Sequence, residues 1–165
     1  FIKNQNTMIE LIENIFTKEF TDSIIKILMA LVLGMILGIE RELSNKDAGI
    51  KTYSLVSLSS AMFVLISIIV TERYIGLTML DPLRMSSYIV VGMGFLGSGI
   101  IIYNKDKNII EGLTTASSLW LVCSIGMSCA HGLFNIAIFA TIICLSLFLG
   151  EKLIFKIKSY LKRNK

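Results

Sequence analysis

The sequence predicts an all-α membrane protein, a bundle of five transmembrane helices. The first observation is that four stretches contain no Asp, Glu, Lys or Arg, while a fifth, 24–39, contains only Lys26. Each runs 16 to 19 residues, close to the roughly 20 apolar residues that span a bilayer. The second is a hydrophobic fraction of 54% with a mean hydropathy of +0.73. Buried helices of soluble proteins rarely run this long without charge, so a soluble helical core is disfavoured. We expect one membrane domain over 1–165, with spans at about 24–40, 52–70, 86–103, 113–130 and 133–149.

Both ends of the chain are predicted to be interfacial. In 8–20 apolar residues recur at helical spacing, which predicts an amphipathic helix lying on the membrane surface. In 151–165 apolar residues share one face and lysines occupy the rest, so this basic amphipathic tail is expected to bind anionic lipid. The tail has two interpretations, a lipid sensor or a plain anchor that fixes topology.

The distribution of basic residues predicts the orientation. With five spans, the 40–51 loop, the 104–112 loop and the tail share one side and carry eleven basic residues. The other side carries five. Because basic residues accumulate in the cytoplasm, the amino terminus is expected outside and the carboxyl terminus in the cytoplasm.

Small residues mark the expected helix contacts. Ala30, Gly34 and Gly38 lie four residues apart on the first span, a spacing that lets helix backbones approach closely. The third span has four glycines within 92–99. This density has two explanations, tight packing within or between subunits, or a broken helix whose free carbonyls line an ion path. Packing is the commoner case.

The sequence predicts neither catalysis nor nucleic-acid binding. No nucleophile–base pair or metal-binding cluster is visible, and the single histidine, His131, lies in a short turn beside Gly132. Three cysteines lie in apolar stretches, where free Cys packs as a small hydrophobic residue. The chain is therefore expected not to be an enzyme.

The polar residues that carry function are expected at the span ends. By the topology above, a cytoplasmic cluster would contain Glu40, Arg41, Glu42, Lys46, Thr52, Glu111, Thr114 and Thr115. Asp81 and Arg84 would lie outside, and Asp81 before Pro82 is equally typical of a helix cap.

Glu40 lies near the hydrocarbon boundary, where an unpaired carboxylate is costly, so it needs a partner. Arg41, Lys46, a threonine hydroxyl or a bound cation could serve. Glu40 or Glu42 with Glu111 could supply the carboxylates of a Mg²⁺ site, and ion pairing with Arg41 is the simpler alternative.

The ordered motifs of the chain resemble those of the MgtC/SapB family of bacterial inner-membrane proteins. The resemblance runs from about Leu33 to Gly132. Its motifs are Gly38-Ile39-Glu40-Arg41-Glu42, Lys46 with Ala48-Gly49-Ile50-Lys51-Thr52, Asp81-Pro82 with Arg84, Gly94-Phe95-Leu96-Gly97-Ser98-Gly99, and Gly112-Leu113-Thr114-Thr115-Ala116 with Leu119-Trp120. The chain departs from the family pattern at Lys51, Tyr88 and Ser117-Ser118. It also resembles the short form, in which the soluble carboxyl-terminal domain of longer members is absent.

The resemblance implies five transmembrane helices in the bacterial inner membrane. It also implies a link to magnesium limitation, acid stress and, in pathogens, virulence. We expect a regulator that docks on other membrane proteins, such as the F-type ATP synthase, and that could form a homo-oligomer. The alternative is a transporter or channel for magnesium or another cation. Transport usually requires ionisable residues within the membrane, and Lys26 is the sole candidate inside a span, which favours the regulator.

Overall fold

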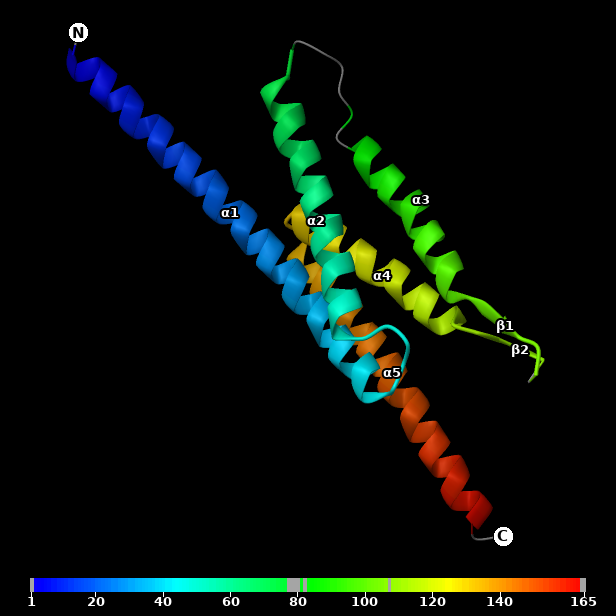
Figure 1. The fold of residues 1–165 in the computed structure, drawn as a ribbon. Coiled ribbons are helices and arrows are strands. Elements are labelled where there is room, and N and C mark those ends of the chain that lie inside the picture. Colours follow the sequence, from blue (N-terminus) through cyan, green and yellow to red (C-terminus); the bar gives the residue numbers. More distant parts are fainter. Residues whose placement is uncertain (1, 77–80, 82, 107, 164–165) are drawn as a thin grey trace.

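The computed structural model describes residues 2–76, 81, 83–106 and 108–163, and confirms the predicted membrane fold (Figure 1). Five helices in these ranges are long and apolar enough to cross a membrane. The elements in chain order are α1 (Ile2–Leu43), α2 (Ile50–Arg73), α3 (Leu83–Ile100), β1 (Ile102–Asn104), β2 (Ile109–Glu111), α4 (Leu113–Ala130) and α5 (Phe134–Arg163).

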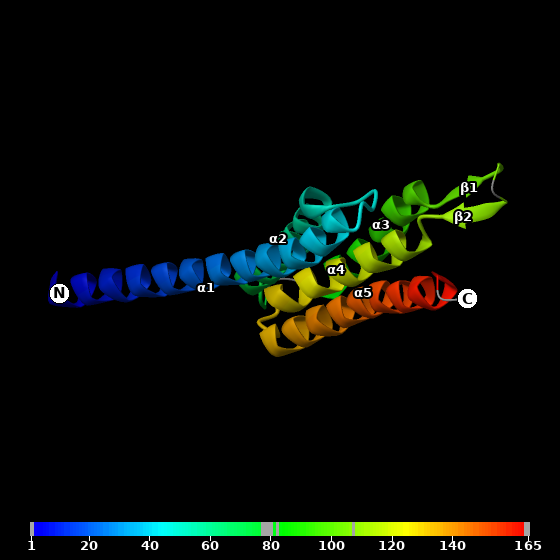
Figure 2. The ribbon, with the colours of Figure 1, turned by 90° about the horizontal axis from the view of Figure 1, so that it is seen from below.

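The predicted end segments are parts of the first and last helices. Segment 8–20 is helical, as predicted, but it continues without a break into the first span as part of α1. No Pro or Gly occurs before Gly34 in α1, so nothing in this sequence ends the helix early. At the other end α5 continues from the last span into the tail as far as Arg163, and residues 164–165 lie outside the described ranges. The amino-terminal half of α1 projects from the bundle in both views (Figures 1 and 2).

The connection between α3 and α4 differs from the prediction. The third span ends at Ile100 rather than at residue 103, and the predicted 104–112 loop belongs to an antiparallel hairpin. In that hairpin Ile102 faces Glu111 and Asn104 faces Ile109. The β-branched residues at 101–102 and 109–110 favour strand over helix, which is consistent with the early end of the helix.

The core of the bundle is formed by α1, α2 and α4. These three helices contact one another, α5 packs on α4 and α1, and α3 packs mainly on the outer side of α4 (Figure 2). Fully buried side chains of the core include Leu37, Tyr53, Val64, Val122 and Ile125. Apolar side chains such as Phe139 and Leu147 face outward, as expected for helices surrounded by lipid.

Glycines allow the closest helix contacts. A Cβ atom added at Gly34 would lie 2.7 Å from Cβ of Ser57, and one at Gly38 would lie 2.7 Å from Cα of Ile50. The predicted ridge on the first span therefore packs against α2. The tightest helix crossing is at Gly126, where an added Cβ would lie 2.1 Å from the carbonyl oxygen of Ser57.

The glycines of α3 do not pack in this way within one copy of the chain. A Cβ added at Gly92, Gly94 or Gly99 would have no heavy atom of the described structure within 4 Å. At Gly97 it would make an ordinary contact, 3.7 Å from Cβ of Ala116. The helix is continuous from Leu83 to Ile100, so the broken-helix explanation of these glycines is wrong.

Candidate functional site

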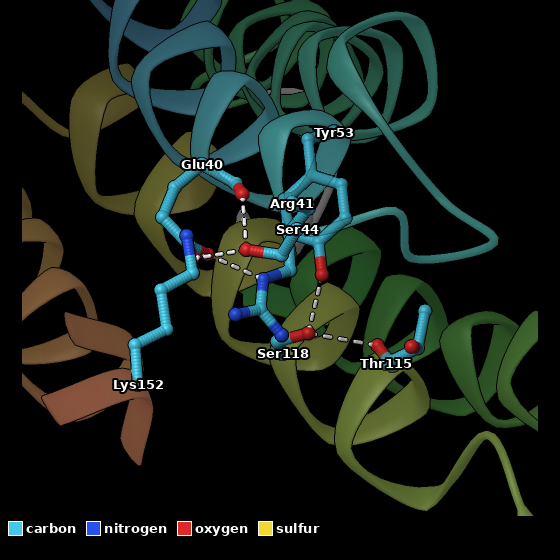
Figure 3. Close-up of polar contacts among 7 residues, drawn as sticks. All are labelled: Glu40, Arg41, Ser44, Tyr53, Thr115, Ser118 and Lys152. Carbon is cyan, nitrogen blue, oxygen red and sulfur yellow. Dashed lines mark hydrogen bonds and ion pairs between the residues drawn. The ribbon is translucent and has the colours of Figure 1, made fainter. Parts of the chain in front are cut away.

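A buried ion pair lies at the carboxyl end of α1. Nε of Arg41 donates a hydrogen bond of 2.6 Å to Oε2 of Glu40 (Figure 3). The exposed fraction is 7% for Glu40 and 1% for Arg41. A charge removed from water to this extent is tolerated only when it is paired, so the pairing predicted between these two residues is confirmed.

Two further groups complete the surroundings of the Glu40 carboxylate. Nζ of Lys152, on α5, lies 3.0 Å from Oε1 of Glu40. Oγ of Ser44 lies 2.6 Å from the same oxygen and 2.7 Å from the Glu40 backbone carbonyl oxygen. Both carboxylate oxygens therefore have protein donors. Residues of the first and the last helix therefore meet at this carboxylate (Figure 3).

The guanidinium group of Arg41 has a second, aromatic contact. Its Cζ atom lies 3.5 Å from the centroid of the Phe148 ring on α5, a cation–π arrangement that is strongest when it is desolvated. The Nη1 nitrogen of Arg41 is buried and has no hydrogen-bond partner among the described residues.

Two buried hydroxyl groups, those of Tyr53 and Ser118, form a hydrogen-bond chain beside the ion pair, called here the hydroxyl relay. Oγ of Ser118 donates to the backbone carbonyl of Thr115 at 2.9 Å. Since a serine hydroxyl has one hydrogen to donate, the short hydrogen bond between Tyr53 and Ser118 has the tyrosine as donor. The relay joins α2 to α4 close to the end of α1 (Figure 3).

The other predicted residues near α1 have separate roles. Oε2 of Glu42 accepts a hydrogen bond of 3.0 Å from the backbone N–H of Ile50, and so satisfies a free donor at the start of α2. Thr52 is exposed in the first turn of α2. Lys46 is also exposed, and it lines a pocket that Arg41 borders as well.

The hairpin keeps Glu111 in a setting different from that of Glu40. Glu111 is exposed on β2 and accepts a hydrogen bond from Nδ2 of Asn104 at 3.2 Å. Thr114 is exposed at the start of α4, whereas Thr115 is buried. Within the described ranges, no group of three or more His, Cys, Asp or Glu side chains is placed to hold a metal ion. Magnesium binding by Glu40, Glu42 and Glu111 thus stays a prediction.

Asp81 and Arg84 lie at the opposite end of α3 from the hairpin (Figure 1). Oδ1 of Asp81 accepts a hydrogen bond of 2.9 Å from the backbone N–H of Leu83, so the helix-cap interpretation of Asp81 is confirmed. Pro82 lies outside the described residues. Asp81 and Arg84 both line a pocket between α2 and α3.

Sequence reasoning missed several members of the site. Lys152, Phe148, Ser44, Tyr53 and Ser118 were not among the predicted residues. One signal was available for Lys152, because it is the first basic residue after the last span and was predicted to share the side of Glu40. Tyr53 and Ser118 carried no such signal.

The chain matches known proteins over most of its length. Residues 27–156 match the MgtC family. Protein SapB of Bacillus subtilis is 36% identical over 117 residues, which cover 69% of this chain and 50% of that protein. Protein MgtC of Salmonella typhimurium is 36% identical over 130 residues, covering 78% of this chain and 52% of that protein. A putative magnesium transporter, YhiD of Escherichia coli, is 33% identical over 134 residues, covering 78% of this chain and 59% of that protein.

The chain spans about half the length of these relatives. No solved structure matches the chain.

Proposed function

Because this chain belongs to the MgtC family, we propose that it is a magnesium-related protein of the bacterial inner membrane that regulates other membrane proteins by docking on them. Its amino terminus would lie outside and its carboxyl terminus in the cytoplasm. Acid or magnesium stress would be the condition under which it acts, and the F-type ATP synthase is the candidate partner that the family resemblance implies.

The observation that carries the proposal is the exposed surface of α3. Among the described residues of this helix, Met93 is buried, while Val91 and Phe95 are 73% and 80% exposed. The neighbouring glycines leave open space beside the backbone. In a membrane such a face lets another helix approach closely, and close backbone approach is what stabilises helix pairs in lipid.

The pairing of the Glu40 carboxylate with protein donors also favours docking over ion transport. Glu40 is the one buried carboxylate among the described residues, and its oxygens already accept from Arg41, Ser44 and Lys152. A cation entering this position would have to displace protein cations, which costs their pairing energy. The pair therefore serves the bundle as a structural contact between α1 and α5.

The test compares ATP-driven proton pumping by purified ATP synthase in liposomes with and without this protein. We expect the protein to change the pumping rate and to be captured with the synthase by photocrosslinking from α3. Phe95→Ala should reduce both effects, because Phe95 is the most exposed large side chain of α3.

The matched control is Phe139→Ala, which removes an exposed phenyl ring from α5, where the exposed fraction is 66%. Pumping that is unchanged by the wild-type protein, or equal effects of the two variants, would contradict docking through α3.

A cation transporter or channel is the second candidate. A relative is described as a putative magnesium transporter, and three carboxylates, Glu40, Glu42 and Glu111, occur near the ends of spans. Isothermal magnesium titration of the purified protein, run beside magnesium flux into liposomes, separates the two. Flux above that of empty liposomes would favour transport, and the regulator predicts none.

A further inference from the structure

A small pocket lies between the end of α1 and the start of the tail region of α5. Its volume is about 280 Å³, and it is lined by Arg41, Ser44, Lys46, Phe148, Glu151 and Lys152. The pocket therefore combines the aromatic ring of a membrane span with charged groups from both sides of the gap between the helices.

The charges around the pocket favour an anion. Arg41, Lys46 and Lys152 line it, and of the nearby carboxylates Glu151 lines it while Glu40 is paired to Arg41 and Lys152. Among the lining residues and Glu40, three cations stand against two carboxylates, an excess of one positive charge at the pocket.

The unpartnered nitrogen of Arg41 is an independent observation that points to a ligand. The residue is 1% exposed, yet its Nη1 has no acceptor among the described residues. A buried donor on a charged group that lacks an acceptor is costly. In Figure 3 one terminal nitrogen of the Arg41 guanidinium is turned toward the side from which Lys152 reaches in. An acceptor group in the pocket would supply the missing partner.

We propose that this pocket binds the phosphate group of an anionic ligand. Arg41 would donate to a phosphate oxygen through its fixed guanidinium, and Lys46 and Lys152 would contribute positive charge. The single hydroxyl hydrogen of Ser44 is already donated to Glu40. Basic pockets between transmembrane helices are typical sites for the headgroups of acidic lipids.

The surroundings of the pocket suit a lipid as the source of the phosphate. Leu43, Leu149 and Leu153, which neighbour the lining residues in the chain, are 75%, 56% and 60% exposed. Acyl chains could cover these side chains while the headgroup occupies the pocket. A soluble phosphate ion would bind to the same donors but would leave these leucine side chains uncovered.

The experiment measures binding of three probes to the full chain in neutral detergent: phosphatidylglycerol, phosphatidylcholine and inorganic phosphate. We expect phosphatidylglycerol to bind more tightly than phosphatidylcholine. Lys46→Gln should weaken it about fivefold, the effect of one basic residue near an anionic headgroup. Lys46 is exposed and its side chain makes no ion pair or hydrogen bond in the described part of the chain, so the variant should melt like the wild type without ligand.

The matched control is Lys51→Gln, which removes an exposed lysine next to the same loop but outside the pocket. Equal weakening by both variants would show nonspecific attraction and overturn the site. So would binding that Lys46→Gln leaves unchanged. If inorganic phosphate binds with the same dependence on Lys46 while the two lipids do not differ, the phosphate site stands and its ligand is soluble.

Discussion

Glu40 and Arg41 illustrate how one pair of neighbouring residues organises the end of the bundle. The two side chains form an ion pair with each other. Because adjacent residues on a helix point in different directions, each side chain also makes a contact of its own: Glu40 with Lys152, and Arg41 with the ring of Phe148. Both additional contacts are on α5. The pair therefore links α1, where it originates, to the last helix of the chain.

Replacing Glu40 by Gln should destabilise the protein whether or not magnesium is present. The change leaves Arg41 buried without its counter-ion, and breaking a buried pair costs on the order of 3 kcal/mol. Thermal melting in detergent, with and without magnesium, measures the effect. Glu111→Gln is the matched control, because Glu111 is exposed, and its cost should stay below about 1 kcal/mol.

The opposite pattern would support an ion site. If magnesium raises the melting temperature of the wild type, and Glu40→Gln removes that rise while the ion-free protein keeps its stability, then a cation rather than Arg41 and Lys152 is the significant partner of Glu40.

At the scale of helices, the glycines divide into two groups that the sequence does not distinguish. Gly34, Gly38 and Gly126 lie where backbones touch, whereas Gly92 and Gly94 face open space. The small-residue spacing on the first span was enough to predict its contact. The denser glycines of α3 looked like the stronger contact, but spacing alone cannot say whether the neighbour belongs to the same copy of the chain.

Gly126→Ala should therefore destabilise the bundle, and Gly92→Ala should not. The added Cβ at Gly126 would lie 2.1 Å from a backbone oxygen of α2, which cannot move aside as a side chain can, so overpacking should cost about 1–3 kcal/mol. At Gly92 there is open space, and alanine favours helix by up to about 1 kcal/mol. Chemical unfolding of both variants in detergent checks the difference, and equal stabilities would contradict the α2–α4 contact.

The sequence predicted most of the fold because charge-free stretches of span length have few alternatives to membrane helices. It predicted that Glu40 needs a partner, and Arg41 was one of the four partners that it left open. It could not identify Lys152 or Phe148, since nothing in the sequence shows which face of α5 meets the end of α1. The hairpin was missed because residues 101–103 are as apolar as the span before them, and β-branched residues occur on both sides of the helix end at Ile100.

At the scale of the whole molecule, α3 is the helix with the least support from its own chain. It packs mainly on the outer side of α4 (Figure 2), and of its 18 residues Met93 is the buried one. If its glycine face pairs with a second copy, Gly94→Leu should shift the oligomeric state while leaving the stability of the single bundle unchanged, because a Cβ added at Gly94 has no heavy atom of the described structure within 4 Å. Gel filtration with light scattering in detergent measures the state. An unchanged oligomer would place Gly94 against lipid or another partner.

The orientation of the whole molecule is the last expectation that the charges support. Arg41, Lys46 and Lys152 gather at one end of the bundle, the end that the excess of basic residues assigns to the cytoplasm. A reporter enzyme fused after Lys165 should therefore be active only if it functions in the cytoplasm, and a reporter that needs the periplasm should be silent there. Because α1, α2 and the following helices alternate across the membrane, a fusion in the turn at His131 should show the reverse. Periplasmic activity of the Lys165 fusion would invert every side assignment, including the cytoplasmic position of the Arg41 pocket.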